Sequence, residues 1–307
     1  MTDLHILNGD SISHLFAVSG ILGEAFVWRE ALCEGQAGID ITSEKHWAYR
    51  QAYLKETYSA YEQKKFDQLK NDFQQLKPHD YGEIHLWFEY DLFCQVNMIA
   101  LLAWLAASQI ASEKVYLICV GTHPDYDKLV GLGELTQEQF TALKTTRQQI
   151  IEWDLQIAVK LWNQWCTGQH HKLIETSLQL DQERFPYITP ALKVHIKRFP
   201  FDSTLLTEIE TEILNLISAQ PKTAKAIVSQ LLRRENYYGF GDLQYFNIIE
   251  NLKPLIREEQ GLLQLISSEN LGSEFQLSRN LYYGGASQQD YFYNEMTKSL
   301  TIKKQLG

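Results

Sequence analysis

The sequence predicts an α/β protein: a short, mainly parallel, Rossmann-like sheet flanked by helices, then an all-helical region and a winged-helix-like C-terminal domain. Two observations predict it. Short apolar runs alternate with helical patterns over the first 120 residues, and three short helical patterns precede strand-like pieces near the C-terminus. The chain has 307 residues and 45% hydrophobic content, which is enough for two domains with buried cores.

Four short apolar runs predict the strands of the sheet. Each is closed by polar or turn-forming residues, and a long apolar helix is expected over residues 91–110, between the last two runs. A strand, helix, strand succession of this length favours parallel pairing with right-handed crossovers. The predicted strands are residues 4–8, 25–28, 83–88 and 115–120.

Helical periodicity dominates the rest of the chain. Residues 43–76 are polar with regularly spaced aromatic and leucine residues, which predicts one or two amphipathic helices. Residues 137–165 predict one or two more, with Thr136 as N-cap and Glu138 in the first turn. The pattern stays helical to about residue 252, and short strand-like pieces follow near residues 255 and 262.

Proline spacing places the predicted domain boundary. Pro186, Pro190 and Pro200 fall within residues 181–203, which we assign as a linker. The linker separates an α/β domain with a helical extension, residues 1–180, from a winged-helix-like domain, residues 204–307.

Composition indicates which classes of partner are unfavoured and in which compartment the protein is expected. The net charge of −10 and pI near 5.4 make nucleic acid an unfavoured partner. The longest apolar segment, residues 98–107, is far shorter than the roughly 20 residues of a membrane helix. The N-terminus has no basic run before an apolar stretch, and the four cysteines have no CxxC spacing. We therefore expect a cytoplasmic protein that does not bind membranes, with reduced thiols.

Several motifs in this order resemble an uncharacterised bacterial family, domain of unknown function 1835, with its companion C-terminal domain of unknown function 3658. They are His5-Ile6-Leu7-Asn8-Gly9-Asp10-Ser11, Trp28-Arg29-Glu30 leading to Glu34-Gly35, Leu86-Trp87-Phe88-Glu89-Tyr90-Asp91-Leu92 followed by Gln95, and Gly131-Leu132-Gly133-Glu134-Leu135. The resemblance continues at residues 190–200 and 207–216, at Gly241-Asp242-Leu243-Gln244 and at Tyr283-Gly284-Gly285.

The resemblance implies the fold and the domain boundaries, but no activity is established for the family, so it transfers no catalytic residue. One departure concerns metal binding. Similar sequences often place an acid immediately before the glutamine, where this chain has Cys94 before Gln95. If that acid bound a metal, this chain would bind it less well.

Ionisable residues follow each predicted strand, and this is where a site is expected. Ligands of open parallel sheets bind outside the carboxyl ends of the strands. Converging carboxylates with one arginine would suit a divalent metal, a ribose hydroxyl or acid/base chemistry. Gln95 lies on the same helical face as Asp91, four residues away, and either binds the ligand or bonds to Asp91. The candidate ligand-binding residues are Asp10, Ser11, Arg29, Glu30, Glu89, Asp91 and Gln95.

Helix capping is the competing interpretation of these acids. Asp10 or Ser11 could cap the first helix, and Asp91 could cap the long one. Glu89 and Arg29 are poorly placed to cap any predicted helix, which favours a ligand for the set as a whole.

Several familiar chemistries are disfavoured. Gly9-Asp10-Ser11 is similar to the nucleophile turn of one class of serine hydrolase, but no histidine follows His195 to act as the base. Neither GxGxxG nor GxxxxGK[ST] occurs, so no standard nucleotide-binding loop is present. His170 and His171 are adjacent and do not form the i, i+4 pair that zinc favours.

The residues of the C-terminal helices do not favour DNA binding. In a DNA-binding winged helix the third helix carries basic and amide side chains toward the groove. Here that helix is predicted at residues 242–252 and has no Lys or Arg before Lys253, so a protein contact is favoured over DNA.

Two functions remain open from the sequence. The first is a small-ligand-binding protein or enzyme with an acidic site at the carboxyl ends of the strands, and a divalent metal is one cofactor that such a site could hold. The second is a non-catalytic regulator or adaptor that contacts a protein partner through its winged-helix-like domain. The two differ in whether the carboxylates meet in an open site or only cap helices and form salt bridges.

Overall fold

The fold is described from a computed structural model, which describes residues 1–234, 237–266 and 281–303. The chain divides into two compact units. The first comprises Met1–Leu192 and Tyr283–Ala286, and the second comprises Lys193–Tyr282 and Ser287–Gly307. Each unit is described by itself.

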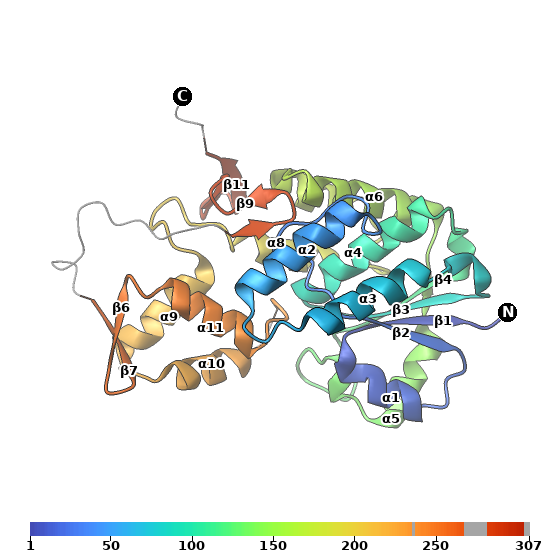
Figure 1. Ribbon diagram of the computed structural model, residues 1–307, viewed down its shortest axis with the longest axis horizontal. Coiled ribbons are helices and arrows are strands. Elements are labelled where there is room, and N and C mark those ends of the chain that lie inside the picture. Colours follow the sequence, from blue (N-terminus) through green and yellow to red (C-terminus); the bar gives the residue numbers. More distant parts are fainter. Residues whose placement is uncertain (235–236, 267–280, 304–307) are drawn as a thin grey trace. The chain divides into compact units, whose positions relative to one another are not determined.

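A five-stranded sheet forms the centre of the first unit (Figure 1). Its order is β2-β1-β3-β4-β5, with β1 to β4 parallel and β5 antiparallel to β4. The prediction of four parallel strands is therefore confirmed. The strands are β1 (Leu4–Asn8), β2 (Glu24–Trp28), β3 (Ile84–Glu89), β4 (Val115–Val120) and β5 (Gln148–Gln149).

Helices cover both faces of the sheet, as the apolar strands require (Figure 1). On one face α1 (Ser13–Val18) and α5 (Gln137–Ala142) close a core that includes Leu7, Trp87 and Phe140. The other face is covered by α2 (Glu44–Thr57), α3 (Gln63–Gln75), α4 (Leu92–Ala107) and α6 (Glu152–Cys166).

The apolar helix α4 is buried along almost its whole length. It lies between β3 and α6, which explains why its sequence lacks an amphipathic pattern. Among the helices that the structure describes, none is long and apolar enough to cross a membrane.

Residues 137–165 depart from the predicted helices. Thr136 caps α5 as expected, because its side chain accepts a hydrogen bond from the amide of Gln139. The helix ends early, however, and β5 follows at Gln148 and Gln149 before α6 begins. The open edge of β4 provides backbone partners for this segment, and helical periodicity cannot reveal such a long-range pairing.

Residues 181–203, predicted as a linker, include α8 (Ile188–Ile196), and the boundary between the units falls inside that helix. The first unit also contains Tyr283–Ala286, from near the other end of the chain. The amide of Gly284 donates to the carbonyl of Gly35 at 2.9 Å, and that of Gly285 donates to Trp165 at 2.8 Å. A Cβ on Gly285 would lie 2.2 Å from the backbone oxygen of Cys166, so only glycine fits there.

The second unit contains three helices in succession, followed by a two-stranded hairpin. The helices α9 and α10 begin at the threonine caps Thr207 and Thr223. A second hairpin near the C-terminus was not predicted. The elements are α9 (Glu208–Ala219), α10 (Ala224–Leu232), α11 (Asp242–Asn251), β6 (Ile256–Glu259) with β7 (Leu262–Leu265), and β10 (Tyr291–Asn294) with β11 (Ser299–Ile302).

Candidate functional site

Two of the predicted carboxylates lie together at the carboxyl edge of the sheet. Glu89 is the last residue of β3, and Asp91 is the N-cap of α4, so the turn between these elements brings them close. The thiol of Cys94, in the first turn of α4, joins them. One ligand atom from each of the three residues lies within 4.8 Å of the other two.

Glu89 binds a loop that returns to the same edge. Its Oε1 accepts a hydrogen bond from the amide of Leu132 at 2.8 Å. Leu132 opens the short 3-10 helix Leu132–Glu134, so Glu89 does satisfy a helix terminus, contrary to the expectation that it caps nothing. A Cβ on the preceding Gly131 would lie 2.9 Å from Glu89 Oε2. The loop can therefore approach the carboxylate only because this position is glycine.

Asp91 performs the capping role that was weighed against ligand binding. Its Oδ1 accepts a hydrogen bond from the amide of Cys94 at 2.8 Å, and its backbone is extended, as at an N-cap. Capping and ligand binding are compatible, because a carboxylate has several lone pairs and one cap bond uses a single one.

The side chain of Gln95 does not bond to the Asp91 carboxylate, although its backbone amide donates to the Asp91 carbonyl at 2.9 Å. Its Nε2 donates to the carbonyl oxygen of Glu89 at 2.6 Å and so fixes the end of β3. Within the described part of the chain, the buried Gln95 Oε1 has no hydrogen-bond partner. Since a buried amide oxygen without a donor is costly, this atom would gain from a ligand that donates a proton.

The pKa values of both carboxyl groups are raised. Burial, with the charge of Asp91 as the next cause, raises the pKa of Glu89 to about 7, and the Leu132 and Gly133 amides only partly oppose this. Burial likewise raises the pKa of Asp91 to about 6, against the lowering effect of the Cys94 amide. The ion pairs formed by described residues include no cation paired with either group. Near neutral pH Glu89 is therefore partly protonated, whereas Asp91 is mostly ionised.

Asp10 and Arg29 form a separate pair at the ends of β1 and β2. Their carboxylate and guanidinium make bidentate contacts of 2.7–3.0 Å, and 66% and 48% of the side chains are exposed. The hydrogen bond from Arg29 lowers the pKa of Asp10. Among the described residues, no hydrogen bond or ion pair joins Asp10 or Arg29 to Glu89 or Asp91. The exposed Ser11 lies beside the loop that binds Glu89, near Gly133.

Glu30 lies in the interior and not at the edge. Its carboxylate accepts from Arg50 Nε at 2.8 Å, and neither side chain is exposed. Arg50 also donates to the carbonyls of Glu34 and Ala31, so the pair joins the loop after β2 to α2. A structural role accounts for Glu30, and we remove it from the ligand-binding candidates.

Sequence reasoning missed three residues of the edge. Asn8, which ends β1, donates to Cys94 Sγ at 2.9 Å and accepts from Asn97 at 2.8 Å. Asn97 in turn donates to the carbonyl of Glu30 at 2.6 Å. Asn8 was recognisable as a polar residue ending an apolar run. Cys94 was noted only as a departure from similar sequences, and Asn97 lies within an apolar helix and gave no signal.

Comparison with known proteins adds no assignment to this geometry. No protein-family model matches the chain, and a search of curated proteins finds no match either. The resemblance to the uncharacterised bacterial family therefore stays a prediction.

Proposed function

We propose that the chain binds a small ligand at the carboxyl edge of its sheet, through Glu89 and Asp91, and that the ligand carries positive charge or hydrogen-bond donors. One observation carries the proposal: two desolvated carboxyl groups lie together there, with raised pKa values and no ion pair from the described residues. Keeping like charges together in this way lowers stability, so a bound cation or donor is the simplest reason for the arrangement.

Two groups beside the carboxyls also suit a ligand that carries hydrogen-bond donors or positive charge. Gln95 Oε1 is a hydrogen-bond acceptor without a partner among the described residues. The sulfur of Cys94 could in addition coordinate a metal ion. A divalent ion held by two carboxylates and a thiolate is one such ligand, since binding would deprotonate all three groups. An amine or amidine is the organic alternative.

A proton-transfer reaction is the chemistry that this site supports best. A general acid or base works best with a pKa near the working pH, and the pKa of Glu89 is raised to about 7. Asp91 is better suited to binding, because its cap bond with α4 fixes its position.

A thermal-shift panel tests this proposal. Wild type, Glu89→Gln and Asp91→Asn would be screened against Mg²⁺, Mn²⁺, Zn²⁺ and a set of small amines and amidines. At least one probe should raise the wild-type melting temperature by several degrees, and either substitution should abolish that shift. Both substitutions are nearly isosteric, and Asn remains a good N-cap, so both variants should fold.

Asp10→Asn is the matched control, because it removes one carboxylate at the same end of the sheet from an exposed pair. It should leave the shift unchanged. If every probe that stabilises the wild type stabilises Glu89→Gln and Asp91→Asn equally, the edge is not the site. The role of a regulator or adaptor would then take its place.

That second function is favoured by the second unit, which we propose is a winged-helix-like module. Supporting this are the order α9, α10, α11 and hairpin, and an antiparallel bridge from Lys222 to Leu263 that adds a third strand position. A cavity of about 370 Å³ lies between α11 and the hairpin. Its lining includes the apolar Phe246, Ile249 and Leu263 and the charged Glu250, Lys253, Arg257 and Glu258. This lining suits a protein side chain, whereas the acidic first turn of α11 does not suit DNA.

A further inference from the structure

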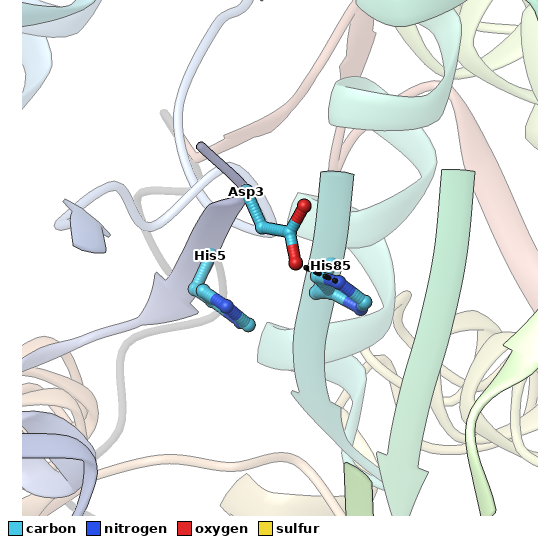
Figure 2. A group of neighbouring side chains, drawn as sticks. All are labelled: Asp3, His5 and His85. Carbon is cyan, nitrogen blue, oxygen red and sulfur yellow. Dashed lines mark ion pairs between the residues drawn. The ribbon is translucent and has the colours of Figure 1, made fainter. Parts of the chain in front are cut away.

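We infer that Asp3, Glu83 and His85 form a second, independent site at the amino edge of the sheet, which binds a divalent transition-metal ion such as Zn²⁺. The strands bring these residues together. His85 lies in β3, one residue into the strand, Glu83 immediately precedes β3, and Asp3 immediately precedes β1. Because β1 and β3 are adjacent and parallel, with His5 opposite His85, the three residues lie at the same edge of the sheet. Figure 2 shows two of them, Asp3 and His85, beside each other.

His85 is the buried member, and its ring lies beside the two carboxylates without forming a hydrogen bond to either. The side chain is fully buried, yet neither Nδ1 nor Nε2 has a hydrogen-bond partner within the described residues. Its Nε2 is directed at the carboxylate of Asp3, as Figure 2 shows. A buried imidazole without partners is costly, and a cation at Nε2 would supply the missing interaction.

Distances between the donor atoms suit a tetrahedral ion. His85 Nε2 lies 3.1 Å from Glu83 Oε2 and 3.7 Å from Asp3 Oδ2. In a tetrahedral zinc site with bonds of 2.0–2.2 Å, the ligand atoms are separated by about 3.4 Å. Both distances from His85 Nε2 are close to that value, and binding an ion would require the two carboxylates to move toward one another. Three protein ligands would leave one coordination position for water.

His85 is also in the protonation state that a metal needs. Burial lowers the pKa of His85 to about 3, with the neighbouring His5 and Lys144 as further causes. The imidazole is therefore neutral at pH 7 and has a free lone pair. The carboxylates are partly exposed, 27% for Asp3 and 34% for Glu83, which leaves a route from solvent.

His5 does not belong to the ligand set, although it lies beside it. Its Nδ1 accepts a hydrogen bond from Trp87 Nε1 at 3.0 Å, which leaves the proton on Nε2, and Nε2 in turn bonds to the carbonyl of Leu22 at 3.1 Å. Both nitrogens are therefore occupied. The ring stacks on His85 with 4.6 Å between centroids and so holds the ligand ring in place.

Two cations border the site and set its affinity. Lys144 Nζ lies 3.8 Å from Asp3 Oδ2, and Arg147 Nη2 lies 3.5 Å from Glu83 Oε2. Both contacts are longer than tight hydrogen-bonded ion pairs, which are about 2.7–2.9 Å. The cations therefore compete with a metal without displacing the carboxylates from His85.

Titration of the metal-free protein with Zn²⁺ by isothermal calorimetry tests the inference, together with the visible absorption of the Co²⁺ complex. Glu83→Gln and Asp3→Asn should each weaken binding at least tenfold and remove the tetrahedral Co²⁺ band. Lys144→Met should strengthen binding severalfold, because it removes a competing positive charge. That gain is a readout that a merely structural role for these residues would not produce.

Glu113→Gln is the matched control, since it removes an exposed carboxylate just before β4, near the same edge. It should leave the affinity unchanged, as should Glu89→Gln, which lies about 13 Å away along β3. If Asp3→Asn and Glu83→Gln bind Zn²⁺ as tightly as Glu113→Gln, the inference is wrong. His85→Gln need not be used, so the test does not depend on a variant that could fail to fold.

Discussion

At the scale of single residues, the site depends on how closely a loop can approach Glu89. The carboxylate is desolvated because the segment around Gly131 covers it, and that segment is positioned by the bond from the Leu132 amide. The same contact explains the raised pKa of Glu89, because burial is its largest cause. The identity of residue 131 and the proton affinity of residue 89 are therefore linked.

Gly131→Ala should displace the Glu89 carboxylate and make it more exposed. The backbone at Gly131 has φ −84°, which alanine adopts freely, so the effect is steric: the new Cβ would meet Glu89 Oε2 at 2.9 Å. We expect a loss of about 1 kcal/mol in stability, and a pKa of Glu89 that returns toward its usual range. Urea unfolding and carboxyl ¹³C NMR measure the two effects.

Gly133→Ala provides the comparison in the same loop, because a Cβ there would have its nearest atom, Ser11 Cβ, at an ordinary 3.6 Å. It should leave both quantities unchanged. Equal effects of the two substitutions would mean that general loop strain, and not the approach to Glu89, is what the alanine changes.

The sequence identified some residues of the candidate site but also selected residues that lie elsewhere. It identified Glu89 and Asp91 because each follows an apolar run, and parallel strands bring such positions to one edge. The same rule also selected Asp10 with Arg29, and Glu30, which pair with charges of their own. Position along a strand shows at which edge of the sheet a side chain lies, but the partner that it binds depends on other elements, such as the helix α2 that carries Arg50.

At the scale of elements, α4 connects the site to the core. It begins at Asp91, contributes Cys94 and Gln95 to the edge in its first turn, and is buried between the sheet and α6 for the rest of its length. A helix fixed in this way holds its first turn rigidly, which favours a preorganised site.

Asp91→Ala should be less stable than Asp91→Asn by about 1 kcal/mol, the usual value of an N-cap side chain. Both variants remove the charge, so their difference isolates the cap bond to the Cys94 amide. Chemical denaturation at pH 8 gives the difference, and hydrogen exchange at the Cys94 amide should be faster in Asp91→Ala alone. Equal stability of the two variants would show that the cap does not support α4.

Element types were predictable wherever one local pattern dominated. The strands β1 to β4 and the helix α4 follow from apolar runs and length, and α5 follows from its cap. The strand β5 was not predictable, since Gln148 and Gln149 are exposed and polar and become a strand by pairing with the distant β4. The hairpin of β10 and β11 was missed because it is short and has no strong turn signal.

At the scale of the whole molecule, the chain returns to its first unit near the C-terminus. Tyr283–Ala286 belongs to that unit, and Gly284 and Gly285 bond to Gly35 and Trp165 there. Contacts between residues more than a hundred positions apart leave no periodic trace in a sequence. For this reason the predicted division into residues 1–180 and 204–307 could not include them.

The free energy of unfolding of the whole molecule should depend on pH, because the folded protein holds a proton on Glu89 that the unfolded chain loses. Between its ordinary pKa of 4.5 and about 7, the folded protein keeps this proton while the unfolded chain has lost it. Since the folded state binds more protons in this window, the contribution of Glu89 to stability falls as the pH rises through it. The loss is complete above about pH 7.

The most direct test is the free energy of unfolding of wild type and Glu89→Gln at pH 5.5 and pH 8. The account predicts that the wild type loses stability relative to the variant across this interval, by an amount on the order of 2 kcal/mol at about 1.4 kcal/mol per pKa unit. The buried histidines are common to both proteins, so their titration cancels in the comparison. A difference that does not change with pH would show that Glu89 ionises as in solvent, and would contradict a desolvated carboxyl site at the edge of the sheet.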